Sequence, residues 1–157
     1  MEIIDIKTVE RVFNDLTRGV TLNTKIGIFF RALANALQHT DFANKGISAK
    51  ATADGKAIAI VTPHGDVVGT AEHIRDDNTL AVRITFSVIQ TGADDKKEAN
   101  EVMTIEMSGQ GHITKVHESQ LAQVLQIEPD LMYEVGVMVL ARVQDNLDST
   151  GATFFSI

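Results

Sequence analysis

The 157-residue sequence contains no cysteine. It therefore has no disulfides, thiolate metal ligands or cysteine nucleophile, and its composition suits a reducing compartment. No apolar run approaches the ~20 residues of a membrane-spanning helix. The first residues, MEIID, lack the basic and apolar regions of a signal peptide. We expect a soluble, cytoplasmic protein with no membrane partner.

Aromatic residues and positive charge are also scarce. Phe, Tyr and Trp make up 5% of the chain, and 14 Lys and Arg face 21 Asp and Glu, so the net charge is −7. An acidic chain repels phosphate backbones, and a base-stacking surface needs more aromatic side chains than these. The composition therefore argues against nucleic acid as a partner.

Sequence motifs for the common chemistries are missing. Nothing matches a phosphate-binding G-x-x-x-x-G-K-[ST] loop, a G-x-G-x-x-G fingerprint, an H-E-x-x-H zinc motif or a G-x-S-x-G elbow. His73 and His112 could meet Glu72 or Glu106 in a metal site only if distant segments come together, and we favour solvated histidines. We expect no cofactor and no metal, and we assign no catalytic residue.

The strongest fold signal is Asp54-Gly55, which lies between two β-like runs at 47–53 and 56–62. Such a dipeptide predicts a hairpin closed by a two-residue type I′ turn, which needs φ > 0 at both central positions. The register then pairs Ala51 with Ile58, and residues that pair directly share one face of a sheet.

This register divides the hairpin into two faces. A small, apolar face suited to covering by a helix carries Ile47, Ala49, Ala51, Ala53, Ile58 and Ile60. The opposite face carries Ala57, Ala59 and Val61 on its second strand. Further strands are predicted at 67–74, 79–90, 101–107 and 112–117, and the period-two alternation of 79–90 is the clearest.

Helical periodicity appears before and after these strands. Residues 8–18 carry the apolar stripe Val9, Val12, Phe13 and Leu16, and Gly19 follows where a helix-ending glycine is common. A second helix over 24–37 would cover the alanine face with Phe29 and Phe30. A short helix is predicted at 119–125.

The C-terminal third fits two patterns. Residues 129–146 fit both a helical stripe and a strand alternation, and we favour the helix. The apolar end 153–157 is expected to dock as an edge strand or against a partner.

These elements predict a single α+β domain over residues 1–157. Two N-terminal helices would pack on an antiparallel meander sheet of five or six strands, with a C-terminal helix and a short terminal strand. Helices on one sheet face leave the other to solvent, a ligand or a partner.

Three functions fit this architecture. We favour a non-enzymatic protein-binding or assembly module that acts in a homo-oligomer or a larger complex such as a virion, with itself or another protein as partner. The alternatives are a small-ligand carrier with a pocket between sheet and helix, and a hydrolase-type enzyme whose site forms only in three dimensions. The interface candidates are Ala57, Ala59, Val61, Phe154, Phe155 and Ile157, because monomers rarely expose large apolar patches.

Overall fold

The structure is a computed structural model that describes residues 3–147. A long helix, α1 (Ile6–Ala36), and a short one, α2 (Thr40–Ala43), precede the sheet, and α3 (Pro129–Asp145) follows it. The sheet consists of β1 (Ser48–Ala51), β2 (Ala57–Thr62), β3 (Gly65–Asp76), β4 (Thr79–Thr91), β5 (Lys97–Met107), β6 (Ile113–Val116) and β7 (Ser119–Leu125). The predicted α+β class is confirmed, with seven strands instead of five or six.

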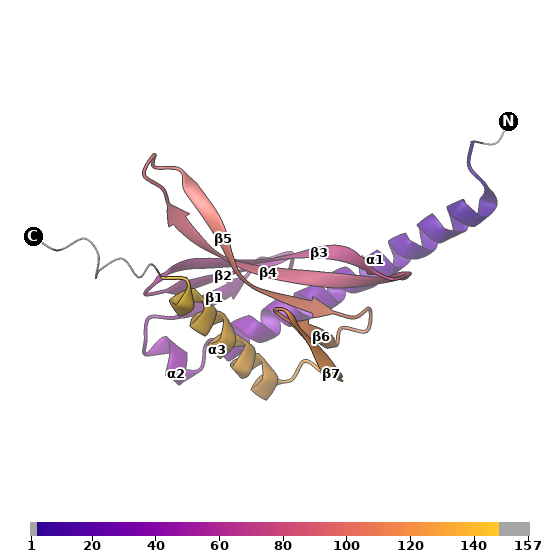
Figure 1. Ribbon diagram of the computed structural model, residues 1–157. Coiled ribbons are helices and arrows are strands. Elements are labelled where there is room, and N and C mark those ends of the chain that lie inside the picture. The colour runs from indigo at the N-terminus through magenta and orange to yellow at the C-terminus, as the bar shows by residue number, and fades with distance from the viewer. Residues whose placement is uncertain (1–2, 148–157) are drawn as a thin grey trace, which may run out of the picture.

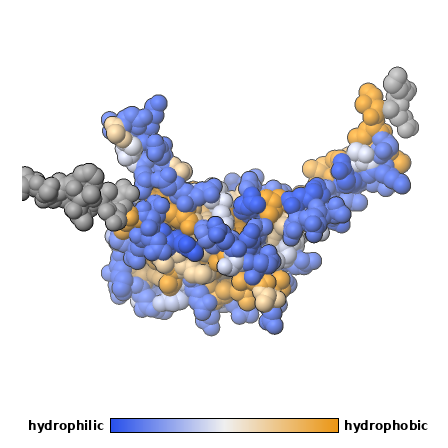
Figure 2. All heavy atoms as spheres, in the orientation of Figure 1, coloured by the Kyte–Doolittle hydropathy of each residue, from blue (hydrophilic) through white to orange (hydrophobic). Residues whose placement is uncertain are grey.

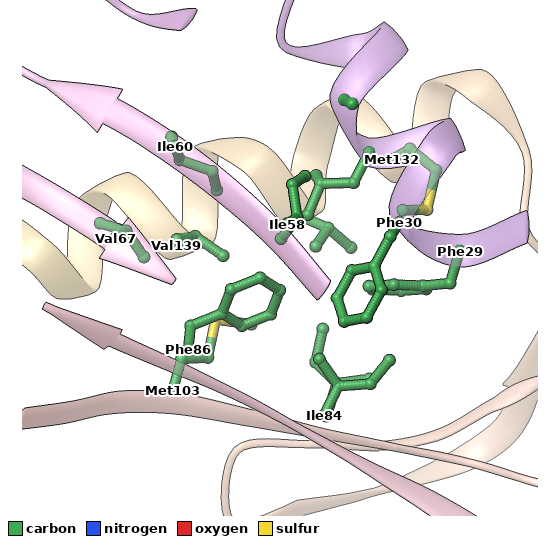
Figure 3. Close-up of a cluster of buried hydrophobic side chains, with 14 of the residues drawn as sticks. Phe29, Phe30, Ile58, Ile60, Val67, Ile84, Phe86, Met103, Met132 and Val139 are labelled. Atoms are coloured by element: carbon green, nitrogen blue, oxygen red, sulfur yellow. The ribbon is translucent and has the colours of Figure 1, made fainter. Parts of the chain in front are cut away.

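The seven strands form an antiparallel meander in the order β1-β2-β3-β4-β5-β6-β7. Helices α1 and α3 pack on the same face of this sheet and against each other (Figure 1). Figure 3 shows the core between these layers, where Phe29 and Phe30 of α1 and Met132 of α3 meet Ile58 and Phe86 of the sheet. Side chains therefore fill the space between the sheet and the helices.

The predicted register of the first hairpin is confirmed, since Ala51 pairs with Ile58 and Ala49 with Ile60. Ile58 and Ile60 are buried in the core, as the alternation predicts. The period-two pattern therefore assigned the inner and outer faces of this hairpin correctly.

The turn of this hairpin differs from the predicted one. Gly55 has φ +73°, as expected, but Asp54 does not have positive φ. The Thr52 N–H donates to the Ala57 carbonyl (2.9 Å), so residues 53–56 form a four-residue loop. Asp54 Oδ1 accepts hydrogen bonds from Thr52 Oγ1 (2.7 Å) and the Lys56 N–H (3.0 Å). These bonds hold an Asx-type turn in place of type I′.

The two predicted N-terminal helices are one continuous helix, so the expected stop at Gly19 is wrong. Gly19 is buried where α1 crosses β3, and a Cβ atom there would lie 3.3 Å from His73 Cε1. This glycine allows a close approach of helix and strand. The start of α1 is capped by Asp5, whose Oδ1 accepts from the Thr8 N–H (2.7 Å).

The helix predicted at 119–125 is also wrong, because this segment forms β7 and pairs with β6. A strand edge offers unpaired backbone groups, and pairing with them outweighs a weak local preference for helix. The favoured helix near the C-terminus is confirmed as α3. Its stripe of Met132, Val135, Val139 and Val143 is buried, whereas Val137 is exposed, which a half-buried strand would not allow.

Candidate interaction surfaces

The predicted interface residues of β2 lie on the sheet face opposite α1 and α3. Ala59 and Val61 are exposed, with Val61 48% accessible, and Ala57 is half-buried. Val68 of β3 pairs with Ala59 and is half-buried too. These four residues form a small apolar patch, and its role as an interface stays a prediction.

The remainder of this outer face is not apolar. Glu72, Arg83, Glu106 and Lys115 stand opposite one another on β3, β4, β5 and β6. Arg83 Nη1 lies 3.4 Å from Glu72 Oε1, and Lys115 Nζ lies 3.6 Å from Glu106 Oε2. Alternating charges on neighbouring strands are typical of a solvated face. Much less of the outer face is therefore apolar than we expected for a sheet face that no helix covers.

The other predicted interface residues, Phe154, Phe155 and Ile157, lie outside the described residues. The expected docking of the segment 153–157 accordingly stays a prediction.

His73, one of the two histidines considered for a metal site, contacts α1 instead. His73 Nε2 lies 2.9 Å from Asn23 Oδ1 of α1. Glu72 is its neighbour on β3 and therefore points to the opposite face of the sheet. Within residues 3–147, no three His, Asp or Glu side chains lie close enough together to hold a metal ion.

One polar cluster joins α2 to α3. The Tyr133 hydroxyl donates to Asp41 Oδ2 (2.8 Å), and His39 Nδ1 accepts from the Asp41 N–H (3.1 Å). The rings of His39 and Tyr133 pack edge to face with centroids 5.4 Å apart. Surface hollows of about 620 and 700 Å³ lie on either side, and Asp41 and Tyr133 line both.

The chemistry of this cluster is that of a structural clamp. The hydrogen bond to Asp41, followed by desolvation and by the negative charge of that carboxylate, raises the pKa of the Tyr133 phenol. A phenol held in its protonated form is a poor base or nucleophile at neutral pH. The hydrogen bond instead fixes α2 against α3.

The largest apolar surface that sequence analysis missed is on the N-terminal half of α1. We call residues 6–20 the α1 arm, whose first turns project beyond the sheet (Figure 1) and whose last turn crosses β3 at Gly19. Four large side chains are mostly exposed along it: Ile6 (72%), Phe13 (63%), Leu16 (60%) and Val20 (68%). Figure 2 shows orange hydrophobic spheres on this projecting part, next to blue hydrophilic ones.

The sequence predicts the apolar stripe of residues 8–18 as the buried side of a helix that packs on the sheet, whereas the structure exposes most of it. The buried residues of α1, Leu22, Ile26, Phe29 and Leu33, continue at helical spacing from Gly19. At about 100° per residue, this buried stripe lies more than 100° around the helix from Phe13 and Val20. The two stripes are thus out of phase. This phase difference is visible in the sequence once α1 is taken as one helix across Gly19.

None of the helices within residues 3–147 is long and apolar enough to cross a membrane. Comparison of the chain with protein-family models, curated proteins and solved structures finds no match. The structure therefore establishes the fold class of the chain, which is an α+β protein with an antiparallel meander sheet.

Proposed function

We propose that this protein is a non-enzymatic assembly module that acts in a homo-oligomer or a larger complex. The observation that carries the proposal is the exposed apolar stripe of the α1 arm. Ile6, Phe13, Leu16 and Val20 are each at least 60% accessible and lie on one side of a projecting helix. Contiguous apolar patches of this kind mark interaction sites.

Burial of the exposed stripe by a partner would be energetically favourable. Burying a side chain the size of Leu or Phe contributes ~1.5–3 kcal/mol relative to exposure. The four exposed side chains of the stripe together represent several kcal/mol that a partner surface would recover. Part of that gain offsets the loss of translational and rotational freedom on association.

The local sequence of the arm supports the same function. The polar side of the arm is highly charged and suits contact with solvent. Within residues 3–147, no strand of the sheet covers its apolar side. Asp5 caps its first turn through the Thr8 N–H. Arg75 of β3 braces its middle through Asp15, with Arg75 Nη2 3.1 Å from Asp15 Oδ2. The helix thus presents a prepared apolar surface, which lowers the ordering cost of binding.

We further propose that the protein acts in the cytoplasm, because the full sequence has no cysteine. The β2 patch of Ala57, Ala59 and Val61 would form a second, smaller contact in the assembly.

A pair of matched variants tests the function. Leu16→Asp places a charge on the apolar stripe, whereas Asn14→Asp places the same charge on the polar side of the arm. Complex size is measured by sedimentation velocity of labelled protein, alone and in an extract of the cells that contain it. We expect the wild type and Asn14→Asp to sediment above the mass of the 17.1 kDa chain in at least one condition. Leu16→Asp should sediment as a monomer with unchanged circular dichroism.

A wild-type protein that remains monomeric in both conditions would refute the proposed function. If Leu16→Asp, Val61→Asp and the wild type all form identical complexes, the protein assembles through another surface, and neither the α1 stripe nor the β2 patch is its interface.

A further inference from the structure

We propose that the α1 arm pairs with the α1 arm of a second copy of this chain, as a two-stranded coiled coil. This inference rests on the proposed assembly function and names the partner. The spacing of the apolar residues along the arm supports this pairing. Ile6, Val9, Phe13, Leu16 and Val20 follow one another at intervals of 3, 4, 3 and 4 residues.

This spacing is that of the a and d positions of a heptad, with Ile6, Phe13 and Val20 at a and Val9 and Leu16 at d. An average interval of 3.5 residues keeps the stripe facing another helix that supercoils with it. A sheet or a flat surface does not require that interval. β-Branched residues at a and Leu at d also favour two strands. Two of the three a positions are β-branched, and one of the two d positions is Leu.

The apolar area of the arm is of the size that a small dimer interface buries. The arm has 15 residues and is ~22 Å long. Ile6, Phe13, Leu16 and Val20 would each remove on the order of 100 Å² from solvent, and the half-buried Val9 about half as much, for a sum of ~450 Å² per arm. A symmetric pair would then bury ~900 Å² in total, which is close to the lower limit for a specific interface.

The charge of the arm is also compatible with pairing between two copies. The arm contains three basic side chains, Lys7, Arg11 and Arg18, and two acidic ones, Glu10 and Asp15, and its capping residue Asp5 balances the remaining positive charge. Two copies of a neutral arm do not repel each other, which suits a two-fold interface made of the same surface twice. A helix that binds an anionic membrane surface carries an excess of Lys and Arg instead. The neutral arm therefore favours a second copy over a lipid surface.

The position of the apolar stripe on α1 is consistent with this pairing. The side of α1 that contacts β3 passes through Gly19, and Asp15 on that side binds Arg75. The stripe lies on the other side, so a second helix can reach it without displacing the sheet. Pairing would extend as far as Val20. The next a/d positions, Asn23 and Gly27, are not large apolar residues.

The test measures the mass of the purified protein alone, by sedimentation equilibrium over a range of concentrations. We expect twice the 17.1 kDa chain mass for the wild type. Leu16→Asp should raise the dissociation constant by on the order of 100-fold or more, because each dimer would bury two charges. Asn14→Asp, with its charge on the polar side, should leave the constant within a few-fold of the wild type.

The absence of cysteine permits a second, independent measurement. In Phe13→Cys the thiol sits in the middle of the stripe, close to its counterpart whichever direction the arms run. A short thiol-specific crosslinker should therefore give a covalent dimer. Arg11→Cys, on the opposite side of the helix, should give far less. Both variants must retain the circular dichroism of the wild type.

The outcomes separate this inference from the proposed function. A purified chain that is monomeric throughout, but forms a Leu16-dependent complex in extract, overturns self-pairing and leaves the assembly function standing. If a purified dimer keeps its dissociation constant in Leu16→Asp and gives no crosslink in Phe13→Cys, it uses another surface. This outcome also overturns self-pairing of the α1 arm. A monomer in both conditions overturns both proposals.

Discussion

Replacing Gly55 with Val tests the hairpin on which the sheet begins. Gly55 has φ +73° and lies against α1, where a Cβ atom would be 3.0 Å from Gly27 Cα and 2.8 Å from Arg31 Nη2. Valine would therefore have to adopt a left-handed backbone conformation and displace its neighbours. Both effects act in the folded state, so we expect the free energy of unfolding to fall.

The magnitude follows from two contributions. A non-glycine residue in the left-handed region costs ~1–2 kcal/mol, with a β-branched residue at the upper end. Crowding adds ~1–2 kcal/mol, since the Gly27 backbone cannot move easily whereas the exposed Arg31 side chain can. The sum is ~2–4 kcal/mol. For a chain of this size, ~1 kcal/mol lowers Tm by ~2–4 °C, so we expect a fall of roughly 4–16 °C.

Thermal and urea unfolding followed by circular dichroism, at one fixed protein concentration, provide the assay. Gly109→Ala is the control, because its backbone φ is not in the left-handed region and the nearest atom to its Cβ would be Leu80 O at 3.5 Å. Gly55→Asn separates the two contributions, since Asn tolerates positive φ but still carries a Cβ atom. A loss for Gly55→Val no greater than for Gly109→Ala would refute the reasoning about this turn.

Three further predictions concern the core, the polar cluster and the arm. Gly69→Ala should lower the free energy of unfolding by ~1–3 kcal/mol in urea titrations, because its Cβ would lie 2.9 Å from Phe86 Cε1; an unchanged midpoint would contradict this packing. Tyr133 is the one tyrosine in a chain without tryptophan, so its phenolate absorbance can be titrated directly. The hydrogen bond to Asp41 raises the pKa of its phenol above the ordinary value, and the pKa should fall toward that value in Asp41→Asn. The hydrogen bond from the Tyr133 hydroxyl to Asp41 stabilises the folded state below ~pH 10. This contribution is lost as pH rises through the pKa of Tyr133 in the folded state. Asp5→Ala should lower the protection of the amide hydrogens in the first turn of α1, measured as the exchange rate relative to the intrinsic rate at the same pH; equal protection in the two proteins would argue against the cap. In the wild type this protection should also be lost as pH falls through the pKa of Asp5, which the hydrogen bond from the Thr8 N–H holds below its usual range.

Local patterns predicted much of the sheet. The alternation of β4 correctly assigned Val82, Ile84 and Phe86 to the buried face, and the Asp54-Gly55 dipeptide gave the right hairpin register. These features depend on residues close together in the chain, where side-chain period and turn chemistry act directly. The exact turn was not predicted, because it depends on hydrogen bonds that Asp54 makes to its neighbours.

The candidate surfaces were predicted less well. The outward direction of Ala59 and Val61 followed from the register, but the charge ladder across β3 to β6 depends on how four strands align. The α1 arm was missed because an apolar stripe does not reveal whether anything covers it. Periodicity indicates that one side of a helix avoids water, and only the position of other elements shows which side they reach.

The sequence by itself determined the class of the protein, the inner and outer faces of the strands, and the absence of cysteine chemistry. These depend on composition and on periods of two or 3.6 residues. Tertiary structure decided three things that local preference leaves open. Gly19 continues a helix because β3 passes beneath it, and residues 119–125 form a strand because β6 offers an unpaired edge. The stripe of Phe13 and Leu16 is exposed because it lies on the side of α1 that faces away from β3, whereas Asp15 and Gly19 face that strand.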